Sequence, residues 1–356
     1  MSAVGRGVRN ETLEQKWSQF ERQADECDVL FLGTSRIYRH LDPAAFDAAL
    51  YEQGIRVRSF NLGMPRMSIL EAQELADRLV ARRPQRLKLV VLEPMLFIFD
   101  LDNWSAEREM ATHDLRGTHL AVSNTLGAER RHGTAWLDRL CYAMPHVLSF
   151  ACREVNLGLA DPLIFPPCPQ RPGPPPDIDA LAGYGPLPVR NDPNGPWRER
   201  FRRFLALPQP PDWNGTSLSA EELAYFKHLV GRIRQTGAEV AFLLGPRVKR
   251  DSHTVAVLES HPEHFADVPL LDYLRGHGPQ TLYQLDYWYD FDHLNAVGAR
   301  ELSQRVARDV APRLRRRIES IPLAVRREAG KSNASSAKRT SMSLRGNGEI
   351  SKARRL

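Results

Sequence analysis

The sequence predicts a three-layer α/β fold with a five-stranded parallel sheet, helices on both faces and a large irregular insertion. Short apolar runs alternate with amphipathic helical segments in residues 27–99 and again in residues 216–320. This alternation is typical of parallel strands, because each needs a crossover connection, usually a helix, to reach the next. Between these two parts, residues 100–215 break the pattern and are rich in Pro, Arg and Trp. We interpret them as an inserted lid or cap region.

The first part of the pattern predicts three strands and two helices. Apolar runs that end at Gly or before Pro predict strands at 28–33, 56–63 and 87–94. The helix at 42–54 opens with an Asp-Pro pair, which is typical of an N-cap and a first helical position, and it stops at a glycine. The helix at 68–84 has helical periodicity and ends before a proline.

The second part predicts the remaining elements. A helix at 219–238 begins with a Ser-x-x-Glu capping box formed by Ser219 and Glu222. We predict strands at 239–246 and 281–286, and a final helix at 295–314 with Asn295 as its N-cap.

Three regions lie outside this pattern. Residues 1–26 are predicted to be a polar, partly helical lead-in, and the insertion shows a helical patch at 136–144. Residues 321–356 are dominated by Ser, Arg, Lys and Gly with scattered apolar side chains in no helix or strand period, so we expect a disordered basic tail.

The net charge of +6 is concentrated near the C-terminus. Residues 313–356 hold thirteen Lys and Arg and three acidic residues, a local net charge of +10, which leaves −4 for residues 1–312. A slightly acidic body does not favour specific nucleic-acid binding, whereas the tail has the charge to contact anionic surfaces weakly.

Several features favour a cytoplasmic protein. The four cysteines have no CxxC spacing, as expected in a reduced compartment. The first twenty residues lack the apolar segment of a secretory signal. The longest apolar stretch, 89–99, is too short to span a bilayer and contains Glu93 and Pro94.

Residues with catalytic chemistry follow three of the predicted strands. Ser35 lies two residues after the glycine that ends the first strand, and Gly63 ends the second. The last strand is followed by the sequence DFDHL, which contains Asp290 and His293. Ligands of open parallel sheets bind beyond the carboxyl ends of the strands, so we expect these residues to converge on one edge.

This arrangement resembles the SGNH (GDSL-type) hydrolase superfamily. The GTS sequence around Ser35 matches the nucleophile motif with Thr34 in the usual Asp position, Gly63 matches the second motif, and DFDHL matches the Asp-x-x-His-Leu motif. The third motif, Gly-x-Asn-Asp, is replaced by EPML, which puts Met95 where the family has Asn. That replacement is similar to SGNH-like acyl-transfer proteins of cell-envelope polymer modification, such as the D-alanine transfer proteins.

The resemblance implies a flavodoxin-like fold and a serine esterase or O-acyltransferase that acts on a small-molecule or carbohydrate ester, a class that includes O-acetylated carbohydrates. Ser35 is then the nucleophile, His293 its base and Asp290 the residue that orients the imidazole. The amides of Ser35 and Gly63 are the candidate oxyanion donors, although Gly63 also suits a tight turn. This chemistry needs no cofactor.

Other roles stay open for several residues. Arg36 is a candidate for substrate binding, but a salt bridge at the surface is the simpler interpretation, and Asn103 is a weak candidate to replace the missing Asn. We expect no metal site, because no acidic or Cys cluster accompanies the histidines at 253, 261 and 264. Two further classes of function remain: a catalytically inactive SGNH-fold binding protein, and a membrane or nucleic-acid adaptor that acts through the tail.

Overall fold

The computed structural model describes residues 10–94, 107–126, 136–154, 181–190, 195–206, 220–248, 265–276 and 278–320. The chain divides into two compact units, residues 1–309 and 310–356. The sheet and all the candidate site residues that the structure describes lie in the first unit.

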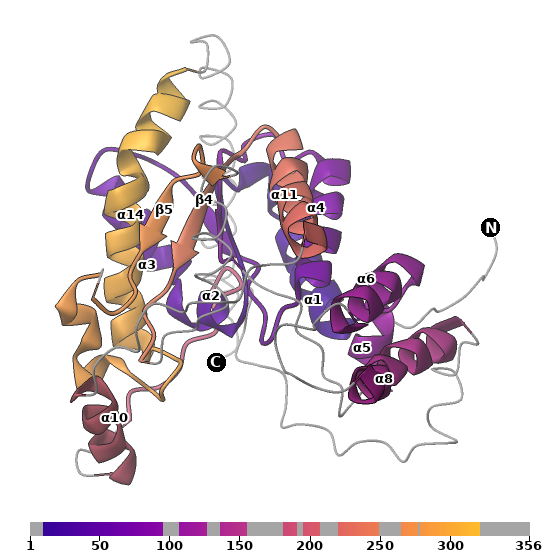
Figure 1. Cartoon of the computed structure of the whole chain (residues 1–356). Helices are drawn as coiled ribbons and strands as arrows, with labels where there is room; N and C mark the ends of the chain where they lie inside the picture. The colour runs from indigo at the N-terminus through magenta and orange to yellow at the C-terminus, as the bar shows by residue number, and fades with distance from the viewer. Residues whose placement is uncertain are drawn as a thin grey trace, which may run out of the picture. The chain divides into compact units, whose positions relative to one another are not determined.

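The sheet has five parallel strands in the order β2-β1-β3-β4-β5, which confirms the predicted α/β fold (Figure 1). Its strands come from both sides of the insertion. They are β1 (Val29–Leu32), β2 (Ser59–Asn61), β3 (Leu89–Leu92), β4 (Glu239–Leu244) and β5 (Leu270–Asp272). This order is the flavodoxin-like one, in which the chain direction across the sheet reverses between β1 and β3. The carboxyl ends of these two strands therefore flank the position where such sheets bind ligands.

The predicted fifth strand at 281–286 is wrong. Residues Gln280–Tyr283 and Leu285–Tyr287 form the short 3₁₀ helices η4 and η5, and β5 lies earlier, at Leu270–Asp272. Leu282 and Tyr283 are adjacent and both buried, an arrangement that a half-buried strand with alternating faces does not allow. The true strand is a three-residue edge strand whose Leu270 is exposed, and it is too short for its sequence to show the period of a strand.

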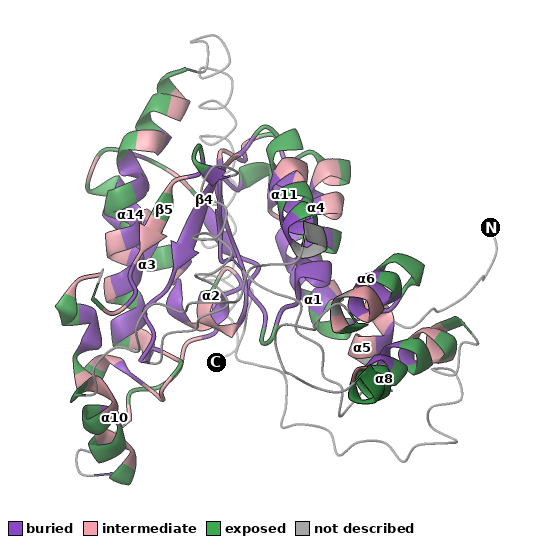
Figure 2. Ribbon diagram, viewed as in Figure 1, coloured by how far each residue is buried: buried purple, intermediate pink, exposed green. Residues whose placement is uncertain are grey.

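Helices cover both faces of the sheet (Figure 1). One face packs against α1 (Glu11–Glu21), α4 (Ile69–Arg82) and α11 (Ala220–Gln235), in a core that alternate strand residues share. On the other side lie α3 (Pro43–Tyr51) and the start of α14 (Ala296–Glu319). The strands are almost entirely buried except for β5 (Figure 2).

The caps that define these helices explain their boundaries. Asp42 accepts hydrogen bonds from the first amides of α3, and Asn295 accepts from Val297 and Gly298 at the start of α14, as predicted. Ser68 and Glu71 form a capping box on α4. The side chains of the capping box predicted for α11 lie outside the described residues.

The described part of the lead-in, residues 10–26, belongs to the core. Leu13, Trp17 and Phe20 on α1 are buried in the main hydrophobic cluster, and the short 3₁₀ helix η1 (Ala24–Glu26) connects α1 to β1. Lys16 is also buried, and its ammonium donates to the carbonyls of Asn61 and Gly183. An amphipathic helix with its apolar face on the sheet is thus fixed next to the end of β2.

The described residues of the insertion include the helices α5 (Glu107–Thr112), α6 (Leu115–Leu126), α8 (Trp136–Glu154) and α10 (Pro196–Ala206). The predicted patch at 136–144 is the first half of α8. The imidazoles of His113 and His146 hydrogen-bond at 2.9 Å and join α5 to α8. Within the described residues, no helix is both long and apolar enough to cross a membrane.

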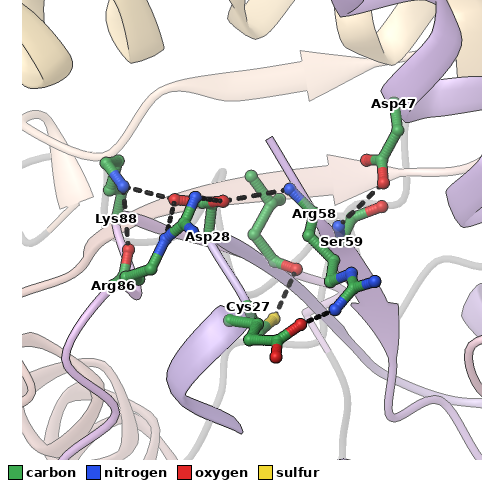
Figure 3. Close-up of polar contacts among 9 residues, drawn as sticks. Cys27, Asp28, Asp47, Arg58, Ser59, Arg86 and Lys88 are labelled. Carbon is green, nitrogen blue, oxygen red and sulfur yellow. Dashed lines mark hydrogen bonds and ion pairs between the residues drawn. The ribbon is translucent and has the colours of Figure 1, made fainter. Parts of the chain in front are cut away.

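The amino-terminal edge of the sheet is held by a buried carboxylate (Figure 3). Asp28 precedes β1 and accepts from the guanidinium of Arg86, the ammonium of Lys88 and the amide of Arg58 at 3.0 Å. These partners lie next to β2 and β3, so one side chain ties three strands together. Nearby, Asp47 on α3 accepts the Ser59 amide of β2 at 3.1 Å.

We expect the Asp47→Asn substitution to stabilise the protein near neutral pH. Burial raises the pKa of Asp47 to about 6, although its hydrogen bonds from Ser59 act in the opposite direction. The folded state therefore keeps a proton that the unfolded chain loses, and stability falls as pH rises from about 4 to about 6. Asn keeps the acceptor for Ser59 and carries no charge, so the gain at about pH 7.5 should be on the order of 1–3 kcal/mol.

Urea unfolding at about pH 4 and about pH 7.5 measures this difference, which should shrink at the lower pH. The matched control is Asp267→Asn, because Asp267 is an exposed carboxylate paired with Arg234 and should change stability little. Equal stability of wild type and Asp47→Asn at about pH 7.5 would contradict the expectation.

Candidate active site

Ser35 lies at the carboxyl end of β1, where the chain turns directly into the short helix α2 (Ser35–His40). Thr34 is the N-cap, and its hydroxyl accepts from the Arg36 amide at 3.4 Å. Gly33 makes the turn possible, because a Cβ there would lie 2.4 Å from Ile37 and 2.6 Å from Glu93. The sequence Gly-Thr-Ser thus places a serine at the first helical position, at the sheet edge.

The structure brings the three predicted catalytic side chains together. The Nε2 of His293 lies 2.9 Å from the Ser35 hydroxyl oxygen. On the other side of the ring, Nδ1 lies 3.0 Å from both carboxylate oxygens of Asp290. Serine, imidazole and carboxylate form one hydrogen-bonded chain across 258 residues of sequence. Nδ1 faces a carboxylate and Nε2 faces a hydroxyl, which is the arrangement that general-base activation of a serine requires.

Asp290 also builds the turn that carries His293. One of its oxygens accepts the amides of Asp292 and His293, both at 2.8 Å. Burial alone would raise the pKa of Asp290, but the hydrogen bonds from His293 and Asp292 outweigh it, and the pKa is lowered. The carboxylate is therefore ionised at neutral pH. Asp292 is exposed, whereas Asp290 faces the imidazole of His293, so the two acids of the turn stand in different environments.

An aromatic cluster from the insertion supports this turn. The ring of Phe291, between the two acids, lies 5.1 Å from Phe204 and 6.1 Å from Phe201. Phe201 in turn lies 5.3 Å from the fully buried Trp288. The helix α10 therefore packs behind the acid–base turn.

The third strand contributes a residue that the sequence analysis did not assign to the site. Glu93 follows β3 directly and is buried, and its carboxylate accepts the amide and hydroxyl of Thr34 at 2.8 and 2.7 Å. Its other oxygen binds Arg36 at 2.6 Å and the buried Arg247 at 3.2 Å. Burial would raise the pKa of Glu93, but the two guanidinium charges and the Thr34 hydrogen bond lower it overall. The nucleophile turn is thus anchored to β3 and to the segment after β4.

The sequence did contain a signal for Glu93, because it is an acidic residue at the end of an otherwise apolar strand. It lies in the segment that replaces the Gly-x-Asn-Asp motif in the resemblance drawn from the sequence, and its carboxylate is occupied by Thr34, Arg36 and Arg247. It holds the backbone next to Ser35. Arg36 therefore forms a salt bridge, as the simpler interpretation held, but its partner is a buried carboxylate.

The residues that follow the second strand support α2. The Gly63 amide donates to the Asn61 side chain at 2.9 Å. The Asn61 amide group in turn donates to the carbonyls of Ile37 and Leu41, at 2.8 and 2.7 Å. A Cβ at Gly63 would lie 2.5 Å from the Tyr38 amide nitrogen, so glycine is needed for close packing. In this geometry the Gly63 amide is occupied, which favours its turn role over the predicted oxyanion role.

A strap from the insertion, residues 181–190, joins the three parts of the site. Its Ala182 carbonyl accepts the Asn61 amide at 2.9 Å, and its Gly185 amide donates to Tyr38 on α2 at 3.1 Å. Further along, the Leu187 carbonyl accepts the Ala296 amide at 2.9 Å, at the start of α14. This part of the insertion is a structural component of the site.

Some predicted residues lie outside the described ranges. They are Asn103, Met95 and the histidines at 253, 261 and 264. Among the residues that are described, no three His, Cys, Asp or Glu side chains are grouped so as to hold a metal ion.

No family model matches the chain, and no curated protein matches it. The site is therefore interpreted from its own residues and geometry.

We expect the substitutions Asp290→Asn and Asp292→Asn to have different effects on kcat. Asn at position 290 can still accept the amides of Asp292 and His293, so the turn should persist. It cannot fix the imidazole tautomer as a carboxylate does, so kcat for an ester substrate should fall by roughly 10³–10⁴-fold. The exposed Asp292→Asn should leave kcat within about threefold, because surface changes of this kind are small. Steady-state kinetics and melting temperatures of both variants measure this, and a reversed order would identify Asp292 as the partner of His293.

Glu93→Gln should destabilise the protein by about 3–5 kcal/mol, because it leaves two guanidinium groups without their buried counter-charge. Turnover that depends on Ser35 should fall with it. The matched control is Glu74→Gln, which removes an exposed i,i+4 partner of Arg78 and should cost less than about 1 kcal/mol. Chemical denaturation near neutral pH compares the two. A loss at position 93 no larger than that at position 74 would show that the buried network does not stabilise the fold.

Proposed function

We propose that the protein is a serine esterase or O-acyltransferase that forms an acyl-enzyme on Ser35. The observation that carries the proposal is the continuous hydrogen-bonded chain from the Ser35 hydroxyl through His293 to Asp290. Its position at the carboxyl ends of the strands, beside the reversal point of the sheet, is where a substrate of this fold class binds.

The chemistry follows from the residue types. His293 takes the proton of the Ser35 hydroxyl as its oxygen attacks the ester carbonyl, and Asp290 holds the imidazolium that results. The proton then passes to the leaving alcohol, and the acyl group remains on Ser35. Water or an acceptor hydroxyl, activated by the same imidazole, releases it. Ser35 is the first residue of α2, so its own amide belongs to the helix turn whose N–H groups lack intrahelical acceptors, and it is the candidate oxyanion donor.

The proposed substrate class is an ester of a small molecule or a carbohydrate, including O-acetylated sugars. The resemblance of the GTS and DFDHL motifs to SGNH enzymes supports this class. Hydrolysis and transfer share the acyl-enzyme and differ in the acceptor. The ratio of acylated acceptor to free acid, measured with an added sugar alcohol, distinguishes them.

Labelling by a fluorophosphonate probe tests the nucleophile. We expect the full chain to be labelled on the peptide that contains Ser35 and to hydrolyse p-nitrophenyl acetate. Ser35→Ala and His293→Ala should lose both activities and keep the wild-type circular dichroism spectrum. The matched control is Ser320→Ala, an exposed serine that should be labelled like wild type. Absence of Ser35 labelling in a folded wild-type protein would favour the alternative, a catalytically inactive binding protein of the same fold.

A further inference from the structure

A second histidine lies at the centre of the site without belonging to the catalytic chain. His40 is the last residue of α2 and is buried, with 1% of its surface exposed. Its Nε2 accepts the backbone amide of Leu294 at 3.0 Å. Leu294 directly follows His293, and the two imidazole rings lie edge to face with centroids 6.1 Å apart. Helix α2 therefore begins with Ser35 and ends with His40, whose side chain is hydrogen-bonded to Leu294, the residue after His293.

We infer that His40 is a positioning residue that sets where His293 stands relative to Ser35, an inference that rests on the proposed function. It does not touch the reacting atoms. It acts through the Leu294 backbone, which it ties to the far end of the nucleophile helix.

The hydrogen-bond pattern explains why such a tie is needed. The turn that carries His293 is closed by bonds within itself: the amides of Tyr289 and Asp290 donate to the His293 carbonyl, and Asp290 accepts from the amides that follow it. These bonds fix the shape of the turn but not its place against α2. The His40–Leu294 bond joins the two, in addition to the Ser35–His293 contact itself.

The end of α2 is itself firmly held, so it is a fixed reference for the turn. The Asn61 side chain binds the carbonyls of Ile37 and Leu41. The Asp42 amide donates to the Ser303 hydroxyl on α14 at 2.8 Å. His40 thus holds the turn that carries His293 in a fixed position relative to a rigidly held helix.

The protonation state of His40 suits this role. A ring nitrogen that accepts an amide N–H carries no proton, so Nδ1 bears the hydrogen. Burial is the main cause that lowers the pKa of His40 well below its usual range, and the charges of His293, Arg36 and Arg247 add to it, while Asp290 acts in the opposite direction. His40 therefore stays neutral and keeps its acceptor at neutral pH.

No hydrogen-bond partner of His40 Nδ1 occurs among the described residues. A buried donor without a partner costs free energy, so stability alone does not favour a histidine at this position. A role in the site accounts for the histidine. The Leu294 amide needs an acceptor, and the His40 side chain is long enough to place Nε2 there.

His40→Leu removes the acceptor and keeps an apolar side chain of similar size. We expect kcat for p-nitrophenyl acetate to fall by ~10–100-fold with KM changed by less than about threefold, since small displacements of a catalytic group cost this much. His40→Gln should recover most of kcat, because its amide oxygen reaches the place of Nε2. His228→Leu, which removes the hydrogen bond between His228 on α11 and Gln73 on α4, is the matched histidine control and should leave kcat unchanged.

Amide hydrogen exchange at Leu294 tests the tie without relying on turnover. Exchange should be slow in wild type, in Ser35→Ala and in His40→Gln, and faster in His40→Leu, while the Asn295 amide, bonded to Tyr287, stays unchanged. Should His40→Leu not fold, His40→Asn, whose side chain is too short to reach Leu294, replaces it.

The outcomes separate the two proposals. A wild-type protein without Ser35-dependent activity overturns the proposed function and the catalytic part of this inference, and exchange at Leu294 still decides whether His40 holds the turn. Fast exchange at Leu294 in wild type overturns the inference alone. Faster exchange in His40→Leu with unchanged kcat overturns it as well, because the tie would then be structural only.

Discussion

The buried carboxylate of Glu93 is the interaction on which the geometry at the nucleophile depends. β1 and β3 run in parallel register with Leu32 opposite Leu92, so the residues that follow the two strands are neighbours. The Glu93 amide extends this ladder by donating to the Leu32 carbonyl at 2.9 Å, and the side chain then turns back onto Thr34. A carboxylate can be buried there because two guanidinium groups compensate its charge. The turn before Ser35 is therefore held by charge and not only by packing.

Both ends of β1 are held in this way, and the two ends differ in purpose. At the amino end, Asp28 is bound by Arg86 and Lys88 and joins three strands. At the carboxyl end, Glu93 is bound by Arg36 and Arg247 and fixes the turn that carries Ser35, the proposed nucleophile. In each case a buried acid with two basic partners fixes a backbone segment that apolar packing alone would not hold in one position. Among the described residues, the carboxyl end is the one where a hydroxyl and an imidazole, those of Ser35 and His293, lie within hydrogen-bond reach of each other.

The sequence predicts the parts of the molecule that local pattern determines. Four strands, the helices α3 and α4 and the cap at Asn295 follow from apolar runs and capping residues. The convergence of Ser35, Asp290 and His293 was predicted from the ends of parallel strands, but that reasoning holds only for Ser35 after β1, because Asp290 and His293 follow the 3₁₀ helix η5 and not a strand. β5 could not be predicted because it is three residues long and exposes Leu270. Glu93, His40 and the strap at 181–190 could not be predicted either, since their partners are distant in sequence and their roles arise only from packing.

The two halves of the site are built on different physical principles. The nucleophile half is held by a buried ion network, a capped turn and a helix tied at its end by Asn61. The acid–base half is a partly exposed turn closed by its own short-range hydrogen bonds and backed by the rings around Phe291. Reaction geometry requires both halves to be fixed relative to each other within a fraction of an ångström. The shape of each half is determined locally, so their relative position must come from the contacts that cross between them: the Ser35–His293 bond, the strap at Leu187 and the buried His40.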